Sequence, residues 1–238
     1  MRWQRTGRLL TVGLLMALSL WAGNRAIHMG WASYQSIEAR ALLGNWVARP
    51  GPIDQLVWNR ARDGFMTALE WDPGNPEYHE GFANLYMVRL SNVPGDSAQL
   101  RPYFELALRH YLTAAALRPT WPYTHASIAS VKWQLGERDA DFRRAIVLAS
   151  RYGPWEVSIH ERLILLGYRS WAVLGETERE AIRGNVRRAH EYRPKETGDL
   201  LATLKKVAPP CGELQVDVPG ACTPPKPDTA TPRKGSGG

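Results

Sequence analysis

The chain has 238 residues, 44% of them hydrophobic and 22% charged, and this composition excludes a protein that is disordered throughout. The formal net charge is +7, but Arg2, Arg5 and Arg8 concentrate part of it at the N-terminus. What remains is small and scattered, so we expect no nucleic-acid partner. The sequence contains no glycine-rich phosphate loop, serine-nucleophile motif or metalloprotease motif. It therefore predicts no catalytic residues, no metal and no cofactor.

An uncharged apolar stretch, residues 9–23, directly follows the three arginines. It is short for a hydrocarbon core about 30 Å thick, which takes about 20 helical residues. Asn24, Arg25 and His28 can extend it by lying at the membrane surface. We interpret residues 1–26 as a membrane anchor. A cleaved signal peptide is the alternative, although Trp21 and Arg25 crowd the positions where a cleavage site needs small residues.

The arginines before the apolar stretch also predict an orientation. Because positive charge is retained on the cytoplasmic side, the N-terminus stays in the cytoplasm and everything after residue 23 is exported. We therefore expect a single-pass protein of a bacterial inner membrane, anchored through residues 9–23, with a periplasmic repeat domain. Residues 27–52 are predicted to form a leading helix, from about Ile27 to Trp46, and a linker; Arg49 to Pro52 break the helix.

A repeated pattern precedes four prolines, at positions 73, 119, 154 and 194. Five, eight and twelve residues before each proline stand only apolar or aromatic residues, and the column at five is alanine throughout. The three columns are Ala68, Ala114, Ala149 and Ala189; Phe65, Tyr111, Ile146 and Val186; and Ala61, Ala107, Phe142 and Ile182. These offsets place one stripe on one face of a helix. Each unit therefore ends in a packed helix that the proline terminates.

A second helix is predicted to begin soon after each of the first three prolines. Asn75 and Pro76 are a helix cap and a first-turn proline, Pro122 has the same role, and a third helix begins near Glu156. A longer first interval is assigned to a loop over Ser91 to Pro102. This helix, turn, helix, proline unit resembles the tetratricopeptide repeat, whose period is about 34 residues.

The predicted fold class is therefore all-α: a tetratricopeptide-like helical repeat array over residues 53–208, following an N-terminal transmembrane helix. A closed bundle of antiparallel helices with proline-punctuated turns would give similar stripes and remains the alternative. Residues 209–238, rich in proline and glycine, are predicted to be a disordered tail. In an exported chain, Cys211 and Cys222 predict one local disulfide, with two unpaired thiols as the alternative.

Three histidines, His79, His125 and His160, each stand six residues after a proline. Equivalent helices of successive repeats lie at least 8–10 Å apart, whereas zinc ligands bind at about 2 Å. We therefore expect structural histidines, placed where the two helices of a unit meet. Acidic pairs such as Glu77 with Glu80 lie at helix beginnings and favour the positive end of the helix dipole.

The first helix of each pair is expected to face the concave side of the array. In this register it exposes aromatic, amide and charged groups that would suit a peptide segment or a sugar chain. The candidate groove residues are Glu77, Glu80, Asn84, Tyr123, Ser130, Trp133, Gln134, Glu161, Tyr168 and Arg169.

Three segments extend this to a narrower resemblance: residues 72–79 (DPGNPEYH), 117–124 (LRPTWPYT) and 152–156 (YGPWE). In this order after a single anchor they resemble the VpsP-type proteins of bacterial polysaccharide clusters, over roughly residues 9–195. The resemblance implies an accessory role beside a polymerase, co-polymerase or export channel for exopolysaccharide of a biofilm matrix. It supplies no catalytic residues, because the matching motifs are turns and helix starts.

The leading functional hypothesis is a non-enzymatic, membrane-anchored periplasmic adaptor that positions protein components of a polysaccharide polymerisation or export complex, with glycan as a further candidate ligand. The alternative is a general envelope assembly or quality-control adaptor that binds peptide segments. A third hypothesis, an enzyme acting on glycans, would require paired groove carboxylates with raised pKa values.

Overall fold

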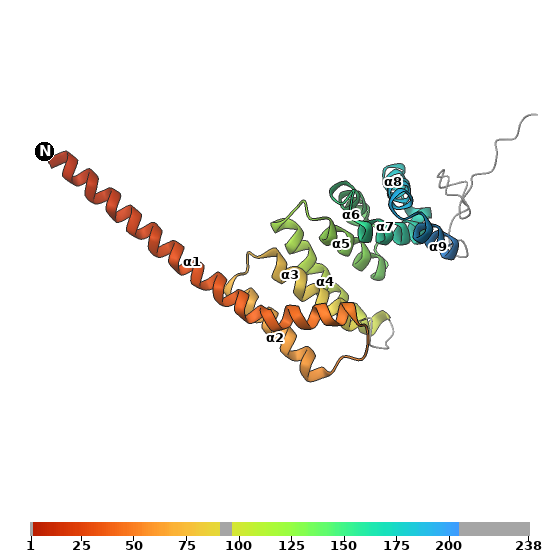
Figure 1. Ribbon diagram of the computed structural model, residues 1–238, viewed down its shortest axis with the longest axis horizontal. Coiled ribbons are helices and arrows are strands. Elements are labelled where there is room, and N and C mark those ends of the chain that lie inside the picture. Colours follow the sequence, from red (N-terminus) through yellow and green to blue (C-terminus); the bar gives the residue numbers. More distant parts are fainter. Residues whose placement is uncertain (1, 91–96, 205–238) are drawn as a thin grey trace, which may run out of the picture. The chain divides into compact units, whose positions relative to one another are not determined.

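The computed structural model describes residues 2–90 and 97–204, and over these ranges the chain is helical without strands (Figure 1). The chain divides into two compact units, residues 1–137 and 138–238, which we describe separately. The first contains α1 (Arg2–Ala48), α2 (Gln55–Trp71), α3 (Pro76–Leu90), α4 (Ser97–Leu117) and α5 (Pro122–Gln134). The second contains α6 (Ala140–Tyr152), α7 (Val157–Ser170), the 3-10 turn η1 (Trp171–Val173), α8 (Glu176–Tyr192) and α9 (Pro194–Leu204).

Within each unit, every helix packs on its successor and several also pack on the next but one. In the first unit α1 packs on α2 and on α3, α2 on α3, α3 on α4 and α4 on α5. In the second unit α6 packs on α7 and α8, α7 on α8 and α9, and α8 on α9. Such neighbour-by-neighbour stacking is the arrangement expected of a helical repeat array.

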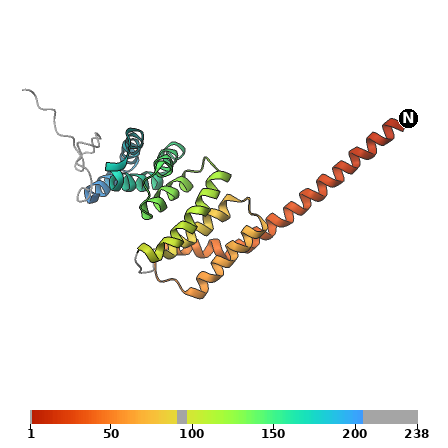
Figure 2. The same ribbon diagram turned by 180° about the vertical axis from the view of Figure 1, so that it is seen from behind.

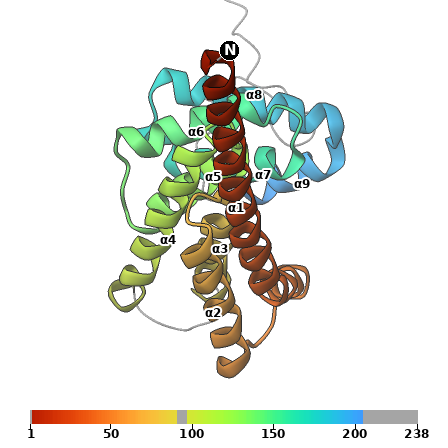
Figure 3. The ribbon, with the colours of Figure 1, turned by 90° about the vertical axis from the view of Figure 1, so that its left-hand side faces the viewer.

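Helix α1 is one unbroken helix that joins the apolar stretch to the first helix pair. Its first half projects from the unit without a neighbouring helix, as Figures 1 and 2 show, and in Figure 3 it points toward the viewer. Its second half buries Ala32, Ser36 and Ala39. By length and composition, Leu10–Ala48 is apolar enough to cross a membrane. The segments predicted as anchor and leading helix are thus two parts of one continuous helix.

An ion pair fixes α1 to the first proline turn. The Nη2 atom of Arg25 lies 2.7 Å from Oδ1 of Asp72, whose side chain is only 3% exposed. The Nδ1 atom of His28 lies 3.4 Å from the carbonyl oxygen of Trp71. Because a buried carboxylate needs a partner, this contact ties the end of the apolar stretch to the turn after α2.

The predicted register is confirmed, because all twelve of its positions are buried. The side chains of Phe65, Tyr111, Phe142 and Ile182 are each at most 1% exposed, and the members of the alanine column are at most 4% exposed. The small alanines let neighbouring helices approach closely, while the larger members of the stripe fill the space between them. The amphipathic stripe is therefore the core of each unit.

Each of the four helices ends two residues before its proline, and the last hydrogen bond of each ends on the register alanine. The N–H groups of Asp72, Arg118, Gly153 and Arg193 donate to the carbonyl oxygens of Ala68, Ala114, Ala149 and Ala189 at 2.9, 2.9, 3.0 and 2.8 Å. Proline has no N–H and cannot continue the ladder, so the helix stops there.

The turns after the first three prolines are alike, and the fourth differs. Asn75, Trp121 and Glu156 donate their N–H groups back to the residue before the proline, at 3.2, 3.3 and 3.3 Å. After Pro194 there is no such turn, because α9 begins at the proline itself and Thr197 already makes a helical bond to Arg193 at 3.0 Å.

The predicted loop from Ser91 to Pro102 was wrong at its C-terminal end. Residues 91–96 lie outside the described residues, but α4 already begins at Ser97 and contains Pro102. A proline in the second helical turn removes only one backbone hydrogen bond, so α4 tolerates it there. The predicted tail and its cysteines, Cys211 and Cys222, also lie outside the described residues, and the disulfide stays a prediction.

Two helical glycines allow the helices to pack closely. A Cβ atom built at Gly81 would lie 2.4 Å from Cε1 of Phe65, and one at Gly167 would lie 2.6 Å from Cγ1 of Ile182. Both neighbours are fully buried register residues that have no room to move. Glycine is therefore required at both positions by packing, not by backbone conformation.

The first prediction concerns this close packing. We expect Gly81→Ala to destabilise the first unit by about 1–3 kcal/mol, since the methyl group overpacks against the Phe65 ring. Gly198→Ala in α9 is the matched control: nothing lies within 4 Å of its Cβ position, so a gain of up to about 1 kcal/mol is expected. Thermal unfolding of the detergent-solubilised chain measures both, and an equal stability change in the two variants would contradict the packing argument.

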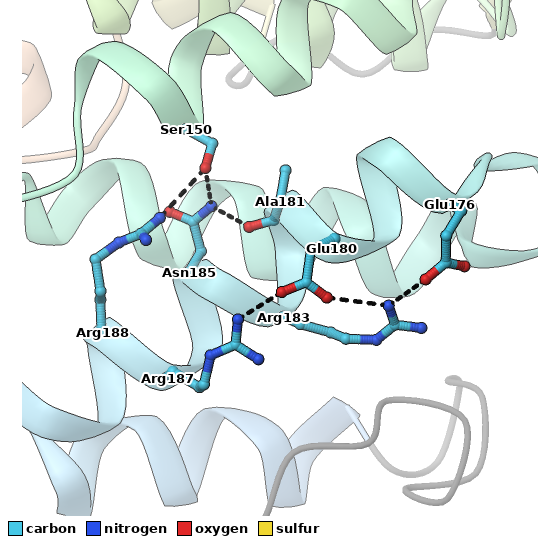
Figure 4. Close-up of polar contacts among 8 residues, drawn as sticks. All are labelled: Ser150, Glu176, Glu180, Ala181, Arg183, Asn185, Arg187 and Arg188. Carbon is cyan, nitrogen blue, oxygen red and sulfur yellow. Dashed lines mark hydrogen bonds and ion pairs between the residues drawn. The ribbon is translucent and has the colours of Figure 1, made fainter.

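In the second unit, a buried asparagine joins α8 to α6 (Figure 4). Asn185, fully buried, donates through Nδ2 to the Ser150 hydroxyl at 2.8 Å and to the Ala181 carbonyl at 2.7 Å. Arg188 donates to the same hydroxyl at 3.2 Å. On the outer side of α8, Arg187 pairs with Glu180 at 2.6 Å and is half exposed.

The second prediction compares these two residues of α8. Asn185→Ala leaves the buried Ser150 hydroxyl with one fewer partner and opens space, and should cost about 1–3 kcal/mol of unfolding free energy. Arg187→Ala removes only an exposed ion pair and should cost less than about 1 kcal/mol. Chemical denaturation of both variants tests the difference. An equal loss of unfolding free energy in Arg187→Ala and Asn185→Ala would show that Asn185 is not the main contact between α8 and α6.

Candidate binding surface

The ten predicted groove residues lie on α3, α5 and α7, which are the first helices of their pairs. Seven belong to the first unit, on α3 and α5, and three belong to the second, on α7. We therefore describe them as two groups. In the first unit α4 packs against both α3 and α5, so its C-terminal residues contribute to the same surface.

An arginine that the sequence did not single out organises the acidic pair of α3. Arg118, the last residue before Pro119, places Nη2 2.8 Å from Glu80 Oε2 and Nη1 3.9 Å from Glu77 Oε1. Burial raises the pKa of Glu80, and the Arg118 charge opposes that rise. Glu80 is thus a structural partner of the arginine, while Glu77, with its side chain 60% exposed, faces solvent.

The same arginine positions two aromatic rings at the surface. Its guanidinium carbon lies 4.1 Å from the centre of the Trp121 ring, and the Trp121 and Tyr123 rings are 5.3 Å apart. Trp121 is 37% exposed, and Tyr123 is partly buried. Stacking on a cation holds the indole in one orientation. Glu77, Trp121 and Tyr123 therefore form a fixed, partly apolar surface beside the proline turn.

Asn84 and Ser130, by contrast, are already engaged within the fold. The buried Tyr111 hydroxyl donates to Oδ1 of Asn84 at 2.6 Å. The Ser130 hydroxyl donates to the Ala126 carbonyl of its own helix at 2.8 Å. Gln134 is exposed at the end of α5, and Trp133 beside it is partly buried. The sequence placed these residues on the correct helix but did not reveal their internal partners.

In the second unit, two of the three predicted residues are exposed and one is not. Glu161 lines a cavity of about 130 Å³ between α7, α8 and α9, and Arg169 is exposed. The prediction that Tyr168 is exposed was wrong: only 4% of it is accessible, and burial raises its pKa to about 12. The cause is that α7 is buried on most of its circumference, so its polar face is narrow.

An aromatic cavity in the first unit was not predicted. It has a volume of about 190 Å³ and opens between α2, α3 and α4. Its lining consists of Gln55, Trp58, Tyr86, Arg89, Leu90, Leu100 and Tyr103. The Trp58 and Tyr86 rings meet edge to face at 5.3 Å, and the Tyr86 and Tyr103 rings stack at 6.1 Å.

Arg89 is held at the wall of this aromatic cavity. It donates through Nη1 to the carbonyl oxygen of Ile53 at 2.9 Å and through Nη2 to the side-chain oxygen of Gln55, and its guanidinium lies 5.8 Å from the Trp58 ring centre. Aromatic faces beside a fixed guanidinium and an amide can stack a planar or ring-shaped group and hydrogen-bond its polar edge. The signal was present in the sequence only as three aromatic residues far apart.

The three register histidines are confirmed as structural, and the structure shows what they do. Their Nε2 atoms lie 2.9 Å from the Pro73 carbonyl for His79, 2.7 Å from the Pro119 carbonyl for His125, and 3.0 Å from the Pro154 carbonyl for His160. Nε2–H must be the donor, since a carbonyl oxygen only accepts. Each histidine thus fastens the proline turn to the helix that follows it.

His79 also contacts a second histidine, His110 of α4. Their Nδ1 atoms are 3.0 Å apart, and since His79 donates through Nε2, its Nδ1 accepts from Nδ1–H of His110 when both rings are neutral. Burial, then the charges of His79 and Arg109, lower the pKa of His110 to about 4. Among the described residues, no three histidine, cysteine or acidic side chains are grouped so as to hold a metal ion.

Comparison with known proteins addresses the fold alone. A crystal structure of a thermophilic tetratricopeptide-repeat protein of Thermus thermophilus matches 82% of this chain and 93% of its own chain, with a TM-score of 0.50 and 20% sequence identity. The chain has a tetratricopeptide-like fold. No protein-family model and no curated protein matches it. Repeats of this architecture are scaffolds that present surfaces for binding other proteins.

The observed fold confirms the expected helical repeat array. The alternative of a closed antiparallel bundle is not required to explain the proline register. The first unit carries two distinct candidate binding features: the surface of Glu77, Trp121 and Tyr123, and the aromatic cavity around Tyr103. Neither contains the paired carboxylate arrangement that the glycan-enzyme hypothesis required. Glu80 has a raised pKa but is paired with Arg118 and not with a second buried acid.

The third prediction concerns acid stability. Burial lowers the pKa of His110 to about 4 and also lowers the pKa of His160, so these two side chains bind fewer protons in the folded chain than in the unfolded chain below about pH 6.5. Their contribution to stability is therefore full above pH 6.5 and falls as the pH drops toward 4. His110 should account for about 1–3 kcal/mol of that loss.

The measurement is the melting temperature of wild type and of His110→Gln at pH 7.5 and pH 4.5. Gln keeps a polar side chain of similar reach but does not titrate, so the variant should lose less stability on acidification. The control is His28→Gln, an exterior contact of α1. Equal acid sensitivity of wild type and His110→Gln would show that the His79–His110 contact is not a titrating element.

Proposed function

We propose that this chain is a membrane-anchored adaptor of a bacterial inner membrane. Its N-terminus lies in the cytoplasm and its repeat units lie in the periplasm, where they position protein components of an exopolysaccharide polymerisation or export complex. It acts by binding and does not catalyse a reaction. The domain assignment follows: residues 1–26 anchor the chain, residues 27–52 lead into the array, and residues 53–208 form it.

The observation that carries the proposal is the continuity of α1. Leu10, Leu14 and Leu18 are exposed on a helix with no neighbour, whereas Ala32 and Ala39 of the same helix are fully buried in the first pair. Exposed leucines on an isolated helix are stable in lipid and not in water. Since the helix does not break between the two regions, the repeat unit is joined to the membrane without a flexible linker.

Charge supports the orientation. Arg2, Arg5 and Arg8 precede the apolar stretch, and the first charged residue after it, Arg25, is neutralised by Asp72. Positive charge in the sequence is therefore concentrated on the N-terminal side of the span, which is the cytoplasmic side for most single-pass proteins.

The link to polysaccharide rests on the resemblance of the three turn segments, and two surfaces fit it. All three segments are proline turns, and the second includes Trp121 and Tyr123 of the surface beside Glu77. The aromatic cavity lined by Tyr103 and Arg89 has the mixture of ring faces and hydrogen-bonding groups that sugar rings require. A glycan chain passing the adaptor is thus a second candidate ligand beside the protein partners.

A peptide-binding envelope adaptor is the alternative, and one observation favours it. The Glu77, Trp121 and Tyr123 surface is accessible and held rigid by Arg118, as an anchor for a partner's side chains would be. Rigid accessible aromatics are common energetic centres of protein interfaces.

The fourth prediction separates these functions with the full-length chain in its own membranes. Trp121→Ala and Tyr103→Ala remove one exposed ring each, so neither should unfold the chain; Tyr192→Ala, at a half-exposed tyrosine of the second unit, is the matched control. If the proposal holds, deletion of the gene lowers matrix polysaccharide, and cross-linked partners include glycosyltransferase or export proteins that Trp121→Ala loses.

A separate binding measurement tests the ligand of the aromatic cavity. Tyr103→Ala should weaken binding of isolated matrix oligosaccharide by about ten-fold, as loss of one stacking face commonly does, and Tyr192→Ala should not. Unchanged matrix sugar on deletion, together with binding of unrelated peptides, would replace the proposal with the peptide-adaptor alternative. Release of the chain from membranes by alkaline extraction would contradict the anchor.

A further inference from the structure

Beyond the apolar stretch, α1 has a second exposed apolar face that the fold does not use. Ile27, Tyr34 and Ile37 are 67%, 64% and 56% exposed, although they belong to the part of the helix that packs in the first unit. Burial of large apolar side chains is favourable by roughly 1.5–3 kcal/mol each, so a solvent-exposed row of them indicates a surface that another molecule covers.

The face has a strict seven-residue period. Gly13, Leu20, Ile27, Tyr34, Ala41 and Ala48 follow one another at intervals of seven, and three residues after each of the first five stand Met16, Gly23, Gly30, Ile37 and Gly44. All of these are apolar or glycine. Several exposed positions off this face, among them Glu38, Arg40 and Asn45, are polar. This is the a and d pattern of a coiled coil.

The heptad face lies on the side of α1 away from the repeat unit. Ala32, Ser36 and Ala39 are buried against α2 and α3. At about 100° per residue, their mean direction is nearly opposite to that of Tyr34 and Ile37. A partner helix on the heptad face therefore meets no helix of its own unit, and the aromatic cavity between α2, α3 and α4 stays open.

The heptad face is complementary to a copy of itself. Side chains of a helix lean toward its N-terminus, and the Tyr34 ring lies 5.7 Å from the Trp31 ring one turn earlier. A Cβ atom at Gly23, Gly30 or Gly44 would meet nothing within 4 Å, so each glycine is open space. From Leu20 to Tyr34, bulky a positions therefore alternate with glycine d positions, and a second copy in register places its a side chains against these glycines.

From this pattern we infer that a second copy of the chain packs in parallel along the heptad face of α1, from Gly13 in the span to Ala48 at the end of the helix. The parallel direction rests on the proposed anchor, since two copies in one membrane have their N-termini on the same side. A seven-residue apolar repeat stays on one side of a helix with 3.6 residues per turn only when the helix supercoils to the left around a partner. A single helix surrounded by lipid has no need of such a repeat. The paired helix is about 50 Å long.

The pairing gives the adaptor a function beyond anchoring one array. Two repeat units leave the membrane side by side, each turned outward because α2 and α3 lie opposite the seam. Partner proteins are then bound in pairs, so a weak contact at each unit gains avidity from the second.

Cysteine cross-linking in native membranes tests the pairing. In a Cys211→Ser, Cys222→Ser background, Gly30→Cys, Tyr34→Cys and Ile37→Cys lie at a or d positions, and Met29→Cys is an exposed control off the seam. Disulfides form where Cα atoms approach within about 4.4–6.8 Å, so mild oxidation should join the first three and not the control. Co-expression of two differently tagged copies identifies the adduct, which must carry both tags.

A packing variant tests the same contact without oxidation. A Cβ atom at Gly30 meets nothing within 4 Å, so Gly30→Leu should not lower the melting temperature, but the longer side chain fills the hollow for Tyr34 of the second copy. The dimer measured by sedimentation in detergent should weaken by about ten-fold or more, and Met29→Leu should have no effect.

The outcomes separate this inference from the proposed function. Adducts with a single tag and another protein, equal cross-linking at Met29, or a monomer in detergent with wild-type sequence each overturn the second copy as the occupant. Loss of the chain on alkaline extraction with cross-linking intact would leave the pairing and remove the anchor. Cross-linking that fails while the chain stays in the membrane would remove only the pairing.

Discussion

The fold depends on how each second helix ends. At four prolines the last backbone hydrogen bond falls on a buried alanine, and at three of them a histidine of the next helix donates to the proline carbonyl. Together the two contacts fix the angle at which the next helix leaves, because they hold both sides of a short turn. The histidine also gives the proline carbonyl a hydrogen-bond partner within the protein. The surfaces beside these three turns depend on that angle.

In the first unit, α1 is attached at the first of these turns. Arg25 pairs with Asp72 at the first turn, so α1 is attached to the array at the level where its apolar stretch ends. A rigid connection has a different consequence from a flexible tether: in the proposed adaptor, the unit would have one distance and one orientation relative to the span. The proposed adaptor would then present its surface at a fixed height, and the seam on the free side of α1 would fix the second copy as well.

Some of the candidate surface followed from the sequence, and some did not. On the first helices Glu77 is exposed and Tyr123 is partly exposed, as the register predicts. Asn84 lies on the predicted helix but accepts a hydrogen bond from Tyr111, a partner 27 residues away in the sequence. Tyr168 is buried, since periodicity on a helix that packs on several sides does not identify the exposed side. Arg118, which orients Trp121, gave no signal because it appears in the sequence as an ordinary residue before a proline.

Four helix ends and the buried stripe before each proline followed from the sequence, because they depend on local properties: the missing N–H of proline, the size of alanine and a helical period. Which side chains meet across helices followed only from the packing of the folded chain. The aromatic cavity collects Trp58, Tyr86 and Tyr103 from α2, α3 and α4, and the contact of His79 with His110 joins α3 to α4 a second time. Such groupings depend on the crossing of neighbouring helices, which no local pattern specifies. The continuity of α1 was likewise decided by packing, since its second half is held in place by α2 and α3.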